Sequence, residues 1–189
     1  MKTDLHIRAY AADCIVTGVV SLQGERLTDF LADHIEYEFR DAELEALDDG
    51  RIVPIAAVTI PGDELLAVVG VGPRGSSSQR LRTRAHPVLI GIGPYEVGGY
   101  LHAPPTVDPV TAALRRVFVP LTEGFVRRPG GGRVIGVHET IIVNRSHFTW
   151  VEQATSEQLG IVRLPEIAGI VDGRAKDLTP ELSAYRRAP

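Results

Sequence analysis

Cys14-Ile15-Val16-Thr17-Gly18-Val19-Val20 and Tyr95-Glu96-Val97-Gly98-Gly99-Tyr100-Leu101 lie 81 positions apart and share one pattern. In both stretches every second residue favours one face of a strand, and a glycine, Gly18 or Gly99, stands at the same place. Alternation with a period of two predicts a β-strand with one buried face. A glycine inside such a strand is typical of a bulge or a sharp bend. The chain is therefore expected to hold two equivalent bent strands.

The correspondence covers most of the chain when its first part is shifted by 81 to 82 positions. Asp49-Gly50-Arg51-Ile52 then falls on Gly131-Gly132-Arg133-Val134, and Ile60 falls on Ile142. Few residues are identical, so the match rests on the shared order of turns and apolar positions. That order predicts two tandem copies of one module.

Each copy is predicted to run β-β-α-β-β-β. A sheet of roughly 65 residues has to bury one face by closing, or nearly closing, on itself. We therefore expect a mainly β fold of two small Sm-, SH3- or OB-like β-barrels. The predicted helices are Leu27–Asp33 and, behind the N-cap Asp108 and Pro109, Val110–Arg116. Turns are predicted at Asp48–Gly50, Pro61–Asp63, Pro129–Gly132 and Asn144–Ser146.

Composition shifts mark the expected boundaries. The first module is predicted at 1–71, a glycine- and serine-rich linker at 72–82, the second module at 83–151, and a C-terminal tail at 152–189. The tail is predicted to include an extended segment at Arg163–Ile167 and a short helix from Thr179 to Tyr185.

A motif in the second copy resembles an uncharacterised bacterial family of small domains. Phe118-Val119-Pro120-Leu121-Thr122-Glu123-Gly124 resembles that family's phenylalanine–leucine–threonine–acid strand. Asn144-Arg145-Ser146-His147 resembles its asparagine–basic–x–histidine turn, which precedes the last strand. The first copy keeps only Phe39-Arg40-Asp41-Ala42 and has Pro61-Gly62-Asp63-Glu64 in place of the turn. The resemblance implies no function, because none is established for that family.

Targeting signals and cysteine chemistry are weak in this sequence. The first six residues have no apolar core of signal-peptide length, and the apolar run Leu65–Val71 is far shorter than a membrane span. The single cysteine, Cys14, can form no disulfide within the chain and shares its strand face with Val16 and Val20, so we expect a buried small hydrophobe. A cytoplasmic protein without a membrane partner is expected.

Charge is divided unevenly along the chain, whose formal net charge is −4. Residues 1–78 hold 6 Lys and Arg against 14 Asp and Glu, a net −8, so the remainder carries +4 (−4 minus −8). Nearly all the basic residues are arginines, which bind carboxylates and phosphates alike. A protein partner, a nucleic acid and a plain solvated surface all fit this distribution.

Seven arginines form a candidate basic surface of the second module. A stripe of this kind is typical of proteins that bind a phosphate backbone. The overall acidity weakens that interpretation, because phosphate neutralisation dominates such affinity. The seven are Arg80, Arg82, Arg84, Arg115, Arg116, Arg127 and Arg128.

The turn Asn144-Arg145-Ser146-His147 is the candidate anion-binding site. Its side chains offer several hydrogen-bond donors, which could hold an anion or a phosphate. The competing interpretation is that Asn144 serves the backbone of the turn and His147 caps the hairpin. Phe148 and Trp150, two residues apart, are expected to face the core, with base stacking as the alternative.

Signatures of catalysis and of cofactor binding are missing from the sequence. No nucleophile elbow, zinc-protease motif, phosphate-binding loop or dinucleotide fingerprint occurs. If the strands on either side of Asn144 form a tight hairpin, His138 and His147 lie about 10 Å apart, too far to share a metal. We therefore predict no enzyme activity, no cofactor and no metal.

Three functions remain open at this level. The first is a non-catalytic interaction or scaffold protein that assembles with itself or joins a larger complex. The second is nucleic-acid binding by the basic module, and the third is a sensor of a small anion or nucleotide.

Overall fold

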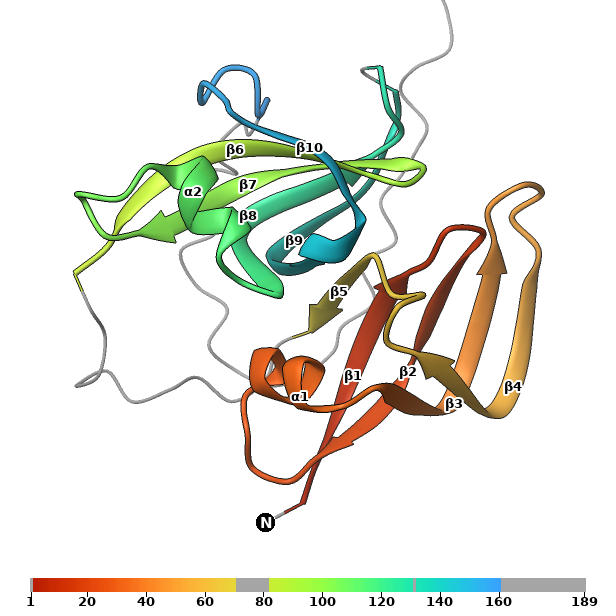
Figure 1. Ribbon diagram of the computed structural model, residues 1–189. Helices are drawn as coiled ribbons and strands as arrows, with labels where there is room; N and C mark the ends of the chain where they lie inside the picture. The colour runs from red at the N-terminus through yellow and green to blue at the C-terminus, as the bar shows by residue number, and fades with distance from the viewer. Residues whose placement is uncertain (1, 71–81, 131, 161–189) are drawn as a thin grey trace, which may run out of the picture.

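A computed structural model of the protein describes residues 2–70, 82–130 and 132–160 (Figure 1). Within these ranges the fold is mainly β, with one antiparallel sheet in the order β10-β6-β7-β8-β9-β5-β1-β2-β3-β4. The strands are β1 (Thr3–Tyr10), β2 (Cys14–Leu22), β3 (Glu36–Ala46), β4 (Ile52–Pro61), β5 (Ala67–Gly70), β6 (Arg84–Ile92), β7 (Tyr95–Ala103), β8 (Phe118–Arg127), β9 (Val134–Asn144) and β10 (Phe148–Gln153). The helices are α1 (Leu27–Asp33), α2 (Pro109–Leu114) and the 3-10 turn η2 (Arg145–His147).

The predicted order of elements is confirmed in both parts of the chain. The first half, β1 to β5 with α1, and the second half, β6 to β10 with α2, follow the same succession. Their pairing also agrees, since β1-β2-β3-β4 and β6-β7-β8-β9 are antiparallel meanders. In each half the fifth strand returns beside the first, so that β5 pairs with β1 and β10 pairs with β6.

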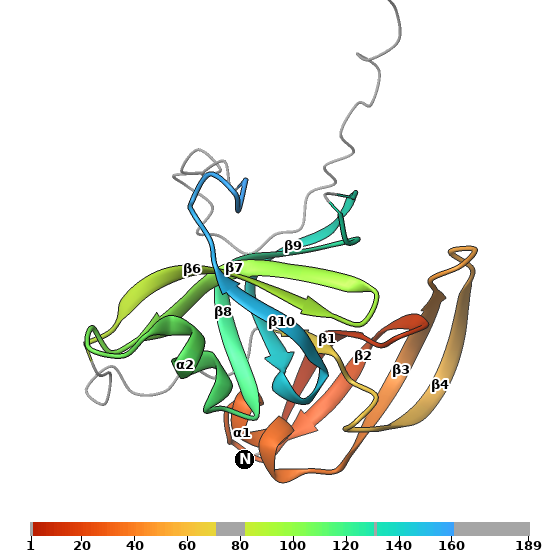
Figure 2. The ribbon, with the colours of Figure 1, turned by 45° about the horizontal axis from the view of Figure 1, so that its top comes forward.

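The predicted closed barrels are wrong, because the sheet is open. Closing the first half would require β5 to pair with β4, but the second side of β5 pairs with β9 of the other half. This pairing joins the two halves into one sheet and leaves β4 and β10 as its edges (Figure 2). The hairpin considered across Asn144 does not form either, because β9 pairs with β5 and β10 pairs with β6.

Both helices begin where local sequence predicts. The α1 helix spans the predicted range Leu27–Asp33. The α2 helix begins at Pro109, and the carboxylate of Asp108 accepts a hydrogen bond from the Thr111 backbone N–H at 2.8 Å. It ends at Leu114, two residues before the predicted end at Arg116.

The two strand glycines mark bulges, as the sequence predicts. The register of β2 against β3 shifts at Gly18, and that of β7 against β8 shifts at Gly99. A Cβ at Gly18 would lie 3.0 Å from the Arg40 carbonyl oxygen, so a side chain there requires the facing backbone to shift. The residues that bend the opposite strands, Asp41 and Glu123, both have positive φ, 48° and 49°.

Two hydrophobic cores meet at the β5–β9 pair, one belonging to each half. Val68 and Ile142 lie in the core of the first half, whereas Ala67 and Val143 lie in the core of the second. Successive side chains of a strand point to opposite faces of the sheet. The two cores therefore use opposite faces at this junction, and each strand contributes to both.

The predicted linker and tail fall mostly outside the described residues. Residues 71–81 and 161–189 lie outside them, and with them Arg80 and the positions where the sequence predicts an extended segment and a short helix. In the part of the chain that the structure describes, no helix has the length and apolar character needed to cross a membrane.

Candidate functional site

The β5–β9 junction shows how this sheet accepts an additional strand. Three residues of β5 pair with three of β9: Ala67 with Val143, Val68 with Ile142, and Val69 with Ile141. All three partners on β9 are buried. The strand pair therefore excludes water on both of its faces.

Asn144 closes one end of this junction with its side chain. The amide Nδ2 donates to the carbonyl oxygens of Leu65 at 3.0 Å and Gly62 at 3.3 Å, and Oδ1 accepts the Ser146 backbone N–H at 3.1 Å. The Asn144 backbone N–H donates to the Leu66 carbonyl at 2.9 Å. Asn144 is buried, and its donors already bind the first half.

The candidate anion turn is assembled, but its most promising donor is occupied. Arg145 and Ser146 are exposed and His147 is half-buried. The Ser146 hydroxyl donates to Asn144 Oδ1, within the turn. This arrangement agrees with the interpretation that Asn144 serves the structure of the turn. β10 leaves the turn toward β6, so His147 caps no hairpin.

Tyr10 extends across the same junction into the second half. Its hydroxyl is hydrogen-bonded to His138 Nε2 at 2.9 Å, and its ring packs edge-on against Tyr95 with 5.4 Å between centroids. Burial raises the pKa of Tyr10 and of Tyr95. Burial, and then the charge of Arg8, lower the pKa of His138, which favours its neutral form.

Metal binding gains no support in the described residues, where no group of three or more His, Cys, Asp or Glu could hold an ion. The separation predicted for His138 and His147 assumed a hairpin of β9 with β10. That hairpin does not form, because β10 pairs with β6.

The candidate basic residues do not form one stripe. Arg84 lies opposite Ala103 at one end of β7, and Arg127 lies opposite Glu96 near the other. Those β7 positions are seven residues apart (103 minus 96), or about 23 Å at about 3.3 Å per residue.

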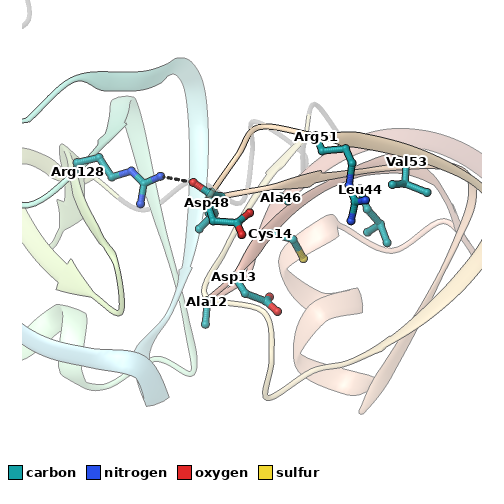
Figure 3. Close-up of a pocket in the computed structure, with 10 residues that line it drawn as sticks. Ala12, Asp13, Cys14, Leu44, Ala46, Asp48, Arg51, Val53 and Arg128 are labelled. Carbon is teal, nitrogen blue, oxygen red and sulfur yellow. Dashed lines mark hydrogen bonds between the residues drawn. The ribbon is translucent and has the colours of Figure 1, made fainter.

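Two of these arginines also have partners. Arg127 forms an ion pair with Glu96, and Arg128 donates to the Leu47 carbonyl of the first half at 2.9 Å (Figure 3). Of the four other described candidates, Arg82 precedes β6, Arg84 begins β6 opposite the far end of β7, and Arg115 and Arg116 follow α2. Arg82, Arg84, Arg115 and Arg116 are exposed.

β4 is an uncovered apolar edge of the sheet. Its sequence, Ile52-Val53-Pro54-Ile55-Ala56-Ala57-Val58-Thr59-Ile60-Pro61, contains no charged residue. Ile52 is 57% exposed and Val53 is 41% exposed. Among the described residues only β3 pairs with this strand. A long apolar edge without charges is a template for pairing with another strand.

β10 forms the opposite edge and carries the only tryptophan. Trp150 is 41% exposed, so the expectation that it belongs to the core is wrong. It pairs with Gly91, and a Cβ on Gly91 would lie 2.2 Å from the indole Nε1. The indole therefore lies across the glycine backbone rather than inside the core.

An open concavity of about 730 Å³ lies beside β4 (Figure 3). Its walls include Cys14, Leu44, Ala46 and Val53, with Asp13 and Arg51 among the polar residues. Burial, and then the charge of Asp13, raise the pKa of the Cys14 thiol to about 11. The thiol therefore stays protonated near neutral pH and acts as an apolar group.

The chain matches no known family model, no curated protein and no solved structure. The candidate site consequently rests on geometry alone. Sequence reasoning predicted a strand at β4 but missed that it is an exposed edge beside a concavity, although one signal was available. Pro54 and Pro61 flank a run without charges, and proline within a sheet is confined to edges, strand starts and bulges.

Proposed function

We propose that this protein is a non-catalytic interaction protein, an assembly or accessory subunit, which binds a protein partner along β4. The exposed, charge-free strand Ile52–Pro61 carries the proposal. Proteins usually protect such an edge with charges, bulges or a covering segment. β4 has only its two prolines, and the concavity next to it offers an apolar wall.

Two copies of one module, as we infer them, account for the shape of this surface. Equivalent turns make equivalent bonds: the Gly62 N–H donates to the Ile35 carbonyl at 2.7 Å, and the Arg145 N–H donates to the Val117 carbonyl at 2.8 Å. The bulges at Gly18 and Gly99 also correspond. In the second copy the fourth strand is covered by β5, so the same strand of the first copy is built to be covered as well.

The divided arginines favour a protein partner over nucleic acid. Phosphate-backbone binding is strengthened by basic residues gathered on one face, whereas these lie at two ends of β7.

Cysteine protection tests the proposal in the native host. Thr59→Cys places a thiol on exposed β4, and Val137→Cys places a matched thiol on β9 at an exposed position away from both sheet edges. Both variants carry Cys14→Ala. We expect Thr59→Cys to be protected from a maleimide in cells, while Val137→Cys is labelled. Equal labelling of both thiols in cells would contradict the proposal.

A further inference from the structure

We propose that the β5–β9 junction is repeated between molecules: β10 of one chain pairs antiparallel with β4 of a second copy, and Trp150 enters the concavity beside that β4. The inference rests on the proposed function and names its partner. The fold offers a template, because each half has a fourth and a fifth strand and the chain joins one such pair internally.

The register of the new pair follows from the internal one. On the fifth strands, Val68 lies opposite Ala9, and Val151 lies opposite Ile90. Ala9 and Ile90 are equivalent, because they face Val16 and Val97 of the two bulged strands. Val151 is therefore the equivalent of Val68.

The fourth strands align in the same way through their third strands. Val119–Val143 in the second half and Tyr37–Ile60 in the first are equivalent pairs. One residue further along each third strand, Pro120 lies opposite Ile142 and Glu38 lies opposite Thr59. Thr59 is thus the equivalent of Ile142. The alignment of Ile60 with Ile142 predicted from sequence is wrong by one residue, because β9 has an extra residue at the register shift between Val126 and Arg127. The internal pair Val68–Ile142 predicts Val151 opposite Thr59 of the second copy. Its neighbours predict Trp150 opposite Ile60 and Glu152 opposite Val58.

The two junctions each have one aromatic residue at the equivalent place, but it lies on a different strand in each. Internally Tyr10 of β1 pairs with the small Ala67 of β5. At the edge the equivalent pair is Gly91 with Trp150. Each pair thus holds one large ring and one small residue, so an aromatic ring stands at the same place in both. The ring of Tyr10 is buried against the other half, whereas that of Trp150 is half-exposed.

In the proposed contact the Trp150 ring packs into the concavity of the second copy, at the place equivalent to that of the Tyr10 ring. Internally Tyr10 packs on Tyr95, and a Cβ on Gly136 would lie 2.8 Å from its hydroxyl. The equivalents of Tyr95 and Gly136 in the first half are Cys14 and Val53. Both line the concavity. Val53 is larger than Gly136, but Cys14 is much smaller than Tyr95, so the indole is placed over Cys14 and against the Val53 side chain.

Charges next to the strands agree with this pairing. At the internal junction α1 contacts β8, so the repeated junction brings α2 toward β3 of the second copy. Arg115 and Arg116 are exposed at the end of α2, and Glu36 and Glu38 are exposed at the start of β3. Basic and acidic residues therefore meet in the proposed contact, which favours this orientation.

The contact is head-to-tail, because β10 and β4 are different surfaces. Every chain has one of each, so assembly continues until a ring closes or a filament grows. Pro61 stands where Asn144 stands internally and lacks the N–H and the amide of that residue. The contact between chains is consequently weaker than the internal junction and depends on concentration.

Light scattering and the fluorescence of Trp150 test the assembly on the full chain. Because this is the only tryptophan, its emission reports on this contact alone. We expect the average mass to rise with concentration while the emission shifts to shorter wavelength. Trp150→Ala should weaken association by at least about tenfold, whereas the exposed control Val137→Ser should leave it unchanged. Association that ignores Trp150→Ala would overturn the proposal.

Disulfide trapping tests the register. In a Cys14→Ala background that still associates like the unmodified chain, Thr59→Cys and Val151→Cys are mixed and oxidised. We expect a mixed dimer, because directly opposed residues bring their Cβ atoms to about 5 Å. Glu152→Cys with Thr59→Cys is the matched control, since a shift of one residue points the thiols to opposite faces. Equal trapping of both mixtures would overturn the register.

The two proposals fail in different ways. A purified chain that stays a monomer at its highest soluble concentration overturns self-assembly. If Thr59→Cys is nevertheless protected in cells, the proposed function stands with a different protein as the partner. Self-association of the purified chain with no protection in cells would overturn the proposed function instead.

Discussion

β9 and β4 are the fourth strands of the two halves, and they differ in what lies beside them. Ile141, Ile142 and Val143 of β9 are covered by β5 and buried. On β4 the equivalent residues are Val58, Thr59 and Ile60, of which Val58 is half-buried, Thr59 is exposed and Ile60 is buried. The same strand position is thus a core element in one half and an edge in the other. The central position shows the difference, because it holds a buried Ile142 where β5 covers the strand and an exposed Thr59 where no described strand covers it.

The largest loss of stability is expected when the contact of β9 with the first half is weakened. Asn144→Leu removes the amide that donates to Leu65 and Gly62 and leaves their buried carbonyl groups without this partner. We expect the free energy of unfolding to fall by about 3 kcal/mol, measured by urea denaturation. Pro61→Ala, at the equivalent position of β4, is the control and should change it by about 0.5 kcal/mol or less. Equal losses would mean that the two strands do not differ as described.

The bulges test whether the two halves share one construction. Gly18→Val and Gly99→Val each force a side chain against the facing strand, where a Cβ at Gly99 would lie 3.1 Å from the Thr122 carbonyl oxygen. We expect each variant to lose about 1 to 3 kcal/mol, seen as a lower midpoint in thermal melts. A wild-type melt for either variant would show that its half tolerates a side chain at the bulge.

A fall in pH is expected to lower the free energy of unfolding through His138, which lies on the covered strand β9. Burial and Arg8 hold the pKa of this imidazole below its ordinary value, so the unfolded chain binds the proton first as the pH falls. The contribution of His138 to stability is complete above the ordinary pKa and is lost as the pH falls through it. His138→Gln should reduce the loss of stability between about pH 7 and pH 5. The exposed His6→Gln serves as the control, and the same pH dependence in both variants would contradict this account.

The smallest effect on stability is expected on the uncovered strand. The Asn144 N–H points to β5, so that of Ile142, two residues away, does so as well. The equivalent N–H of Thr59 therefore points away from β3. Thr59→Pro should cost about 0.5 kcal/mol or less, because an edge strand tolerates proline on its open side. The same variant should abolish the concentration-dependent mass in light scattering, and unchanged association would argue against strand pairing at β4.

Local signals predicted much of this fold. The helix at Leu27–Asp33, the capping of α2 by Asp108 and the bulges at Gly18 and Gly99 depend on residues close in the chain or on side-chain size. The candidate turn at Asn144 was also located, although its amide stabilises the junction. The exposure of Trp150 was not predicted, because it depends on the register of β10 against Gly91.

The sequence by itself determined the order β-β-α-β-β-β in each half, since periodicity, turns and caps act over a few residues. Only the tertiary structure decided which strand lies beside β5. Its two candidates, β4 and β9, are the fourth strands of the two halves, and strand periodicity does not say which of them meets β5. The long-range contacts of Tyr10 and Asn144 with the opposite half accompany the pairing with β9. That pairing left the sheet open and made edges of β4 and β10.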